Sequence, residues 1–263
     1  MAKRKVWVTW MPDEASGLAP NDLLATLARY GVEPTGAPWV DNLEKMAWTE
    51  LAGQLLDPAS ADGWLVAGRR ADLDAVNNRY ALSLLAAMLR EGREQPLATW
   101  FLGLDFAPTE EDMPMLLQGL QLADGRDKGW PARLVAALHG RKSLPVLDFR
   151  FNVIAHPLLG QWFEIGPREG EWRGAIFGAN GDAKITHQAV GPAGQLPEKT
   201  VLEYPTEGIQ AKIGEGDYVA WSVQNRIGPA DSYYAKVEGH PARLLLGENP
   251  AADDAEVSVV NLT

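Results

Sequence analysis

The sequence predicts two domains: an α/β domain with a mostly parallel, flavodoxin-like sheet over residues 1–142, and an all-β sandwich or barrel over residues 143–263. Up to about residue 140, short apolar runs alternate with helical patterns, which is typical of a parallel sheet covered on both faces. Beyond that point the helical period disappears, and short β-prone runs are separated by Gly and Pro. A chain of 263 residues is long enough for two ordinary domains.

The strands of the first domain are predicted from short runs rich in Val, Trp, Leu and Thr, because these residues favour the pleated state. The run at residues 63–67 is apolar throughout and predicts a buried strand. The predicted strands are residues 5–10, 38–40, 63–67 and 97–102.

Helical spacing of apolar residues predicts five helices in the same domain. Asn21 can cap the first helix and Gly31 can end it. Thr109 and Asp112 have the spacing of a capping box, and Pro131 suits the first turn of the last helix. The predicted helices are residues 21–30, 43–56, 77–91, 113–122 and 130–138. The third is almost entirely apolar, so we expect it to be buried or to lie at an interface.

The second domain is predicted as a series of strands with turn residues between them. Asn180-Gly181 is the pair preferred by two-residue hairpin turns, and this register would place His187 opposite Gly174 on an apolar face beside Trp172. An acidic exposed loop is expected at residues 250–256. The predicted strands are residues 146–151, 162–165, 172–179, 183–190, 201–204, 210–213, 218–223, 233–237, 243–246 and 257–262.

Composition excludes several classes of function. With 24 Lys and Arg against 35 Asp and Glu, the formal net charge is -11, so a nucleic-acid partner is not expected. The absence of cysteine excludes disulfides, thiolate catalysis and Cys-type metal sites. The apolar run at residues 6–10, behind the basic start, is too short for a signal peptide, and the longest mostly apolar run, residues 80–89, is too short for a membrane span. We therefore expect a cytoplasmic protein without a membrane partner.

The first half of the chain resembles a Toll/interleukin-1 receptor (TIR) domain in its order of elements. The resemblance covers about residues 3–140: a helix ends at Gly31, a short strand ends at Asp41, and the last helix opens with Trp130 followed by Leu134. It implies a signalling-type fold that works through protein partners or homo-oligomers. It also implies NAD as the substrate where such a domain is catalytic.

The resemblance fails at the catalytic glutamate. Enzymatic TIR domains carry it on the helix after the third strand, in a pattern like Ser-x-x-Trp-x-x-x-Glu. Here Tyr80 falls at the Trp position and Leu84 at the Glu position, and leucine cannot stabilise a developing positive charge. Glu91, farther along that helix, and Glu50, in Trp48-Thr49-Glu50-Leu51 of the preceding helix, are the candidate displaced carboxylates. A solvated helix-face carboxylate is the alternative for Glu50.

Other candidate sites come from strand ends and aromatic residues. Arg69 and Arg70 follow the third strand and could bind an anionic group, or pair with Asp72 and Asp74. The paired surface of Trp172 and His187 could bind a ligand of the β domain. The four histidines, His139, His156, His187 and His240, lack close metal-ligand spacing, and no metal is expected.

These observations predict a protein-interaction or assembly module of a signalling or defence-type complex, without a cofactor. The first alternative is an NAD-consuming enzyme using Glu50 or Glu91, or a hydrolase at the carboxyl edge of the sheet. The second alternative is a receptor whose β domain binds a small ligand or peptide.

Overall fold

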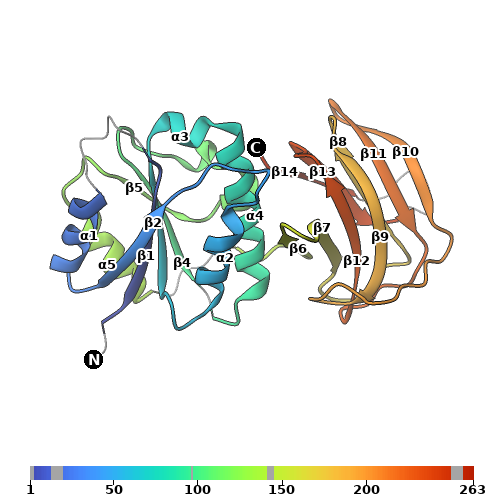
Figure 1. The fold of residues 1–263 in the computed structure, drawn as a ribbon, viewed down its shortest axis with the longest axis horizontal. Coiled ribbons are helices and arrows are strands. Elements are labelled where there is room, and N and C mark those ends of the chain that lie inside the picture. The colour runs from blue at the N-terminus through green and yellow to red at the C-terminus, as the bar shows by residue number, and fades with distance from the viewer. Residues whose placement is uncertain (1–2, 13–19, 96, 141–144, 250–256) are drawn as a thin grey trace. The chain divides into compact units, whose positions relative to one another are not determined.

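The structure is a computed structural model of the 263-residue chain, and it describes residues 3–12, 20–95, 97–140, 145–249 and 257–263. It divides into two compact units, Met1–Pro145 and Val146–Thr263, here called the α/β unit and the β unit. The predicted fold class, an α/β domain followed by a β-rich domain, is confirmed (Figure 1). The predicted boundary at residues 142–143 and the predicted loop at 250–256 lie outside the described residues.

The α/β unit is built on a five-stranded parallel sheet in the order β2-β1-β3-β4-β5. This is the strand order of flavodoxin-like folds, in which the order reverses between β1 and β3. The strands are β1 (Lys5–Trp10), β2 (Glu33–Pro38), β3 (Gly63–Gly68), β4 (Ala98–Gly103) and β5 (Gln121–Asp124).

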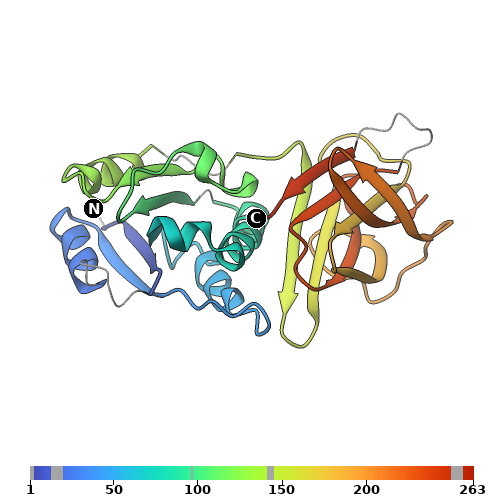
Figure 2. The same cartoon turned by 90° about the horizontal axis from the view of Figure 1, so that it is seen from above.

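Helices cover both faces of this sheet, as Figures 1 and 2 show. On one face, α1 and α5 pack onto β1, β3 and β4 through a cluster that includes Val8, Leu27, Leu65 and Leu134. On the other face, α2 and α3 pack against α4. The helices are α1 (Pro20–Arg29), α2 (Trp48–Leu56), α3 (Arg70–Asp74), α4 (Val76–Gly92) and α5 (Trp130–Leu138).

The second strand and the second helix were predicted at the wrong residues. Strand β2 ends at Pro38, and the segment predicted as a strand, residues 38–40, largely follows it as a loop. Residues 43–47 are turn rather than helix, because Met46 has a φ of 49° and interrupts the helical backbone. Strand β2 also runs so close to β1 that a Cβ at Gly36 would lie 1.9 Å from the Val8 carbonyl oxygen.

The helix predicted at residues 113–122 was wrong as well. Two 3-10 turns, Glu110–Asp112 and Met115–Leu117, are followed by strand β5, which was not predicted from the sequence. Thr109 and Asp112 do form the predicted pair: the Thr109 backbone N–H donates to Asp112 Oδ2 at 2.7 Å, but this contact begins a 3-10 turn. Pro114 removes one backbone donor between the two turns.

The β unit consists of two antiparallel sheets, one in the order β10-β11-β8-β13-β14 and one in the order β6-β7-β12-β9. Phe163 joins their cores, since its ring lies 5.9 Å from that of Phe151 and 5.5 Å from that of Phe177. The strands are β6 (Phe149–His156), β7 (Gly160–Pro167), β8 (Ala175–Asn180), β9 (Lys184–Pro192), β10 (Thr206–Ile213), β11 (Gly216–Val223), β12 (Asp231–Glu238), β13 (Arg243–Glu248) and β14 (Val257–Asn261).

The hairpin predicted at Asn180-Gly181 was wrong. A turn forms there, with Gly181 at a φ of 70°, but strands β8 and β9 belong to different sheets. Both edges of β8 are occupied by β11 and β13, so β9 pairs with β12 instead. Residues 201–204 are not a strand: Asn225 accepts the Glu203 backbone N–H and donates to the Val201 carbonyl, which holds this segment as a loop.

Candidate functional site

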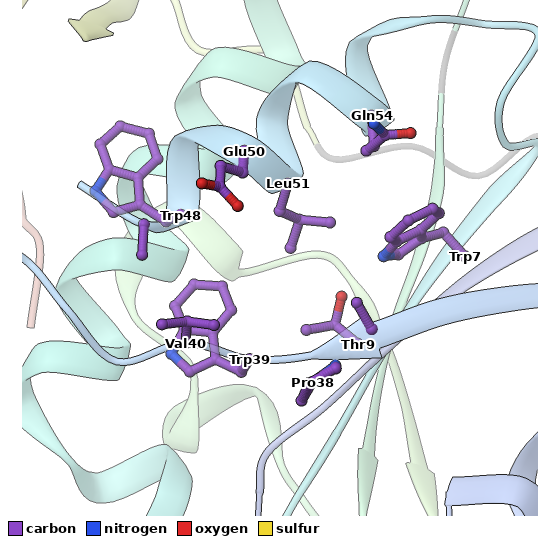
Figure 3. A pocket seen from close by; sticks show the side chains of 11 residues that line it. Trp7, Thr9, Pro38, Trp39, Val40, Trp48, Glu50, Leu51 and Gln54 are labelled. Carbon is purple, nitrogen blue, oxygen red and sulfur yellow. The ribbon is translucent and has the colours of Figure 1, made fainter. Parts of the chain in front are cut away.

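A cavity of about 430 Å³ lies beneath helix α2 of the α/β unit (Figure 3). Strands β1 and β2 form one wall, the segment between β2 and α2 forms another, and the first two turns of α2 cover it. Aromatic and aliphatic side chains dominate. The lining residues are Trp7, Thr9, Ala37, Pro38, Trp39, Val40, Ala47, Trp48, Glu50, Leu51 and Gln54.

Helical periodicity brings four of these residues to the cavity. Ala47, Glu50, Leu51 and Gln54 stand at i, i+3, i+4 and i+7, which is one face of α2 and the residue before it. The buried face of α2 contains Ala52 and Leu55, on the helix that packs against α4. One helix therefore anchors itself with one face and covers the cavity with the other.

Strand alternation supplies the opposite wall. Val6 and Val8 belong to the core beneath α1 and α5, so Trp7 and Thr9 point to the other face of β1, toward α2. Ala37 of β2 is the register partner of Thr9 and lies on the same face. The small side chain of Ala37 leaves space between the edge of the sheet and the helix.

Indole and hydroxyl groups line this wall with different hydrogen-bonding states. Thr9 Oγ1 accepts the Trp64 Nε1–H at 3.0 Å, and Trp39 Nε1–H donates to Asn78 Oδ1 at 2.8 Å. The buried Trp7 Nε1–H has no hydrogen-bond partner among the described residues. Such a donor costs about 1–3 kcal/mol when it is left unpaired.

Glu50 is the one charged residue of the lining, and its side chain is exposed. In Figure 3 it projects from α2 on the same side as Leu51, above Trp39 and Val40. No described residue forms a hydrogen bond or ion pair with its carboxylate. The Ala47 backbone N–H donates to the Asn42 carbonyl, so Glu50 does not cap this helix. It lies in the first turn of α2, where the helix dipole attracts a negative charge.

The segment that leads into α2 is held in one conformation. Asn42 Oδ1 accepts the Lys45 backbone N–H at 2.9 Å, and Thr49 Oγ1 donates to the Met46 carbonyl at 2.8 Å. Met46 adopts a positive φ, which costs a non-glycine residue about 1–3 kcal/mol. Strain of this kind clusters at binding sites, and here it precedes the helix turn that carries Glu50.

Helix α4 does not provide the catalytic carboxylate of a TIR enzyme. Leu84, at the expected position, is fully buried, and Glu91 lies near the end of α4 outside the residues that line the cavity. Of the two candidate carboxylates, the structure therefore brings only Glu50 to this cavity.

Arg70 is engaged in ion pairs at the carboxyl edge of the sheet. Its Nη1 lies 2.6 Å from Asp112 Oδ1 and 3.8 Å from Asp74 Oδ1, and its guanidinium lies 4.1 Å from the centre of the Phe106 ring. The hydrogen bond from Arg70 holds the pKa of Asp112 well below its ordinary value. Arg69 donates its backbone N–H to Asp72 Oδ2 at 2.8 Å. The structure of Arg70 therefore agrees better with the alternative of ion pairing to nearby aspartates than with an open anion-binding site.

Trp172 and His187 do not share an apolar face. Trp172 pairs with Ile227 in an isolated bridge, whereas His187 is exposed on β9 with its ring 6.2 Å from that of Trp162. Both Tyr233 and Tyr234 are fully buried, so neither forms an exposed aromatic surface. The expected ligand surface of the β unit is therefore not assembled from these residues.

Trp7, Thr9 and Trp39 were not singled out as site residues from the sequence. The sequence signal for the cavity itself was the spacing of residues 47, 50, 51 and 54. This spacing places Glu50 on an otherwise uncharged helix face. The predictions of a strand at residues 38–40 and of helix at residues 43–47 obscured this signal.

Among the described residues, no group of three or more His, Asp or Glu side chains is placed to hold a metal ion. None of the helices in this described part is both long and apolar enough to cross a membrane. No protein-family model matches the chain, and no curated protein matches it significantly.

Proposed function

We propose that this protein is a signalling-type module whose α/β unit binds a small molecule in the cavity beneath α2. The observation that carries the proposal is an unpaired carboxylate, Glu50, at an apolar cavity that contains three tryptophans. Ligand sites are typically cavities of about 300–1,000 Å³ with mostly apolar walls and a few polar groups. The resemblance to TIR domains adds the proposal that binding is coupled to a protein partner or to self-association.

The test fills the cavity and measures binding of a neutral aromatic probe. Tryptophol, an indole with a hydroxyethyl chain, is titrated and followed by saturation-transfer NMR. We expect binding by the wild type and loss of binding in Leu51→Trp, because the indole ring introduced at position 51 then occupies the space. Gly53→Trp adds the same ring to α2 outside the lining and should still bind.

A second cavity variant distinguishes loss of the cavity from misfolding of Leu51→Trp. Ala37→Leu fills the space from the strand side and should weaken binding in a protein whose circular dichroism matches the wild type. If both filled variants bind tryptophol as well as the wild type does, the cavity is not the site and the proposal is wrong.

The second candidate function is NAD cleavage with Glu50 as the displaced carboxylate. It is favoured by one observation: Glu50 is among the residues that line the cavity beneath α2, and Glu91 is not. Nicotinamide release from NAD by concentrated protein is the measurement. Release that is abolished by Glu50→Ala and kept by Glu91→Ala would make the protein an enzyme. Absence of release at high protein concentration would favour binding without catalysis.

A further inference from the structure

We infer that the ligand of this cavity is an organic cation with a flat apolar body, whose positive group lies at Glu50. This inference rests on the proposed function, since it names the chemical class that the same cavity selects. It is carried by the charge of the lining, by the shape and chemistry of the walls, and by the position of Glu50 at the solvent side.

The charge of the lining favours a cation. Glu50 is its one charged side chain, and no described residue is ion-paired with it. An anionic ligand would be repelled by this carboxylate, and a neutral ligand would gain no ion pair with it. The whole chain has a net charge of -11, which further favours the approach of cations.

The walls favour a flat, apolar body. Trp7 supplies a partly exposed indole ring, and Trp39, Trp48, Leu51 and Pro38 complete the apolar walls (Figure 3). Indole rings attract cations through their electron-rich faces, by an amount that grows as water is excluded. Aromatic walls next to a carboxylate form the combination by which proteins recognise ammonium groups.

The burial of the lining sets the orientation. Trp39 and Trp48 are only 4% and 3% exposed, whereas Glu50 and Gln54 of α2 are exposed. The apolar body of the ligand therefore enters the cavity, and its cationic group remains at the mouth. This arrangement avoids the cost of burying an unsolvated charge.

Two probes that differ only in the charged group test the inference. Tryptamine carries an ammonium where tryptophol carries a hydroxyl, on the same indole and ethyl chain. Isothermal titration calorimetry at neutral pH measures both probes on the full-length wild type, on Glu50→Gln and on Glu44→Gln. Glu44→Gln makes the same charge change at an exposed residue outside the lining.

We expect tryptamine to bind the wild type roughly tenfold more tightly than tryptophol, because an exposed ion pair and a cation–π contact add together. Glu50→Gln should remove this preference while tryptophol binding stays the same, and Glu44→Gln should keep it. Equal affinities of both probes for all three proteins would overturn the cation inference and leave the binding site standing. Failure of both probes to bind the wild type at millimolar concentration would overturn the inference and the proposed function together.

Discussion

Single residues decide where chemistry is possible in the α/β unit. Leucine at position 84 removes the carboxylate that the TIR resemblance requires, and its complete burial gives it a place in the core instead. Glu50, which follows the turn at residues 43–47, is exposed at a cavity lined by tryptophans. The identity of Leu84 could be read from the sequence, but the surroundings of Glu50 depend on contacts with β1 and β2.

Tyr204 of the β unit has a left-handed backbone conformation, which is unfavourable for a residue with a side chain. It has a φ of 45° and is 75% exposed, so its ring gains little from packing. We expect Tyr204→Gly to stabilise the protein by about 0.5–1 kcal/mol, because glycine adopts this conformation without a steric penalty. Urea unfolding measures the change. Tyr204→Ala, which keeps the strain, should stay within about 0.5 kcal/mol of the wild type, and an equal gain in both variants would contradict the explanation.

Asp112 connects stability to pH at the carboxyl edge of the sheet. It accepts hydrogen bonds from Arg70, from the Thr109 backbone and from the Thr109 hydroxyl. The Arg70 hydrogen bond is the largest of several effects that hold its pKa below the ordinary 3.8. A lowered folded-state pKa means that the stabilisation is present above pH 3.8 and is lost as the pH falls toward the folded-state value.

Asp112→Asn should therefore lower the free energy of unfolding by about 1 kcal/mol at pH 7. The expected loss is this small because Arg70 is partly exposed and water screens its ion pair. The difference between variant and wild type should shrink below about pH 4, where the wild-type carboxylate becomes protonated in the unfolded state. Urea midpoints measured from pH 7 to pH 3 provide the test. Curves that stay parallel over this range would show that Asp112 does not stabilise the fold through its charge.

At the scale of elements, the local patterns predicted α5 and β1 at their observed bounds, Trp130–Leu138 and Lys5–Trp10. Both have strong local signals: proline in the first helical turn and a dense β-prone run. Strand β5 was not predicted, and strand β2 was predicted at the wrong residues. Strand β2, Glu33–Pro38, contains two prolines and a glycine and is defined by its pairing with β1. Strand β9 shows the same limit, because its partner is chosen by the sheet and not by the adjacent turn.

The buried carboxylate of Glu164 forms hydrogen bonds both within the β6-β7-β12-β9 sheet and with the segment after β9. Glu164 of β7 is fully buried and accepts hydrogen bonds from Ser232 Oγ at 2.8 Å, the Gly194 backbone at 2.7 Å and Asn152 Nδ2 at 2.9 Å. Arg150 Nε lies 3.7 Å from Oε1. Burial, followed by the charge of Glu164, raises the pKa of Tyr234 to about 12, so this phenol stays neutral.

Removal of this carboxylate takes the acceptor from the buried Ser232 hydroxyl and, at the same time, from the less buried Asn152 amide and Gly194 N–H. We expect Glu164→Ala to destabilise the protein by about 3–5 kcal/mol, as for other buried charges that lose a partner. Glu238→Ala, at the exposed end of β12, should change stability by less than about 0.5 kcal/mol. Thermal unfolding followed by circular dichroism measures both. A loss below about 1 kcal/mol in Glu164→Ala would show that the network contributes little to stability.

At the scale of the whole molecule, the two-domain fold class could be predicted because periodicity changes between residues 140 and 146, from helical spacing to short β runs. The cavity could not be predicted, since its walls come from β1, β2 and α2, and their pairing fixes which side chains meet. Seven of the ten tryptophans belong to the α/β unit, and three, Trp162, Trp172 and Trp221, belong to the β unit. This distribution gives each unit its own spectroscopic probes.

The most direct measurement of the central claim follows the indole N–H signals of all ten tryptophans by ¹H–¹⁵N NMR during a tryptamine titration. The Trp7 signal, assigned with Trp7→Phe, should shift most, because its Nε1–H is unpaired beside the cavity. The signals of Trp162, Trp172 and Trp221 should stay in place. A Trp7 signal that does not move while tryptamine binds, or shifts confined to the three tryptophans of the β unit, would contradict a ligand site beneath α2.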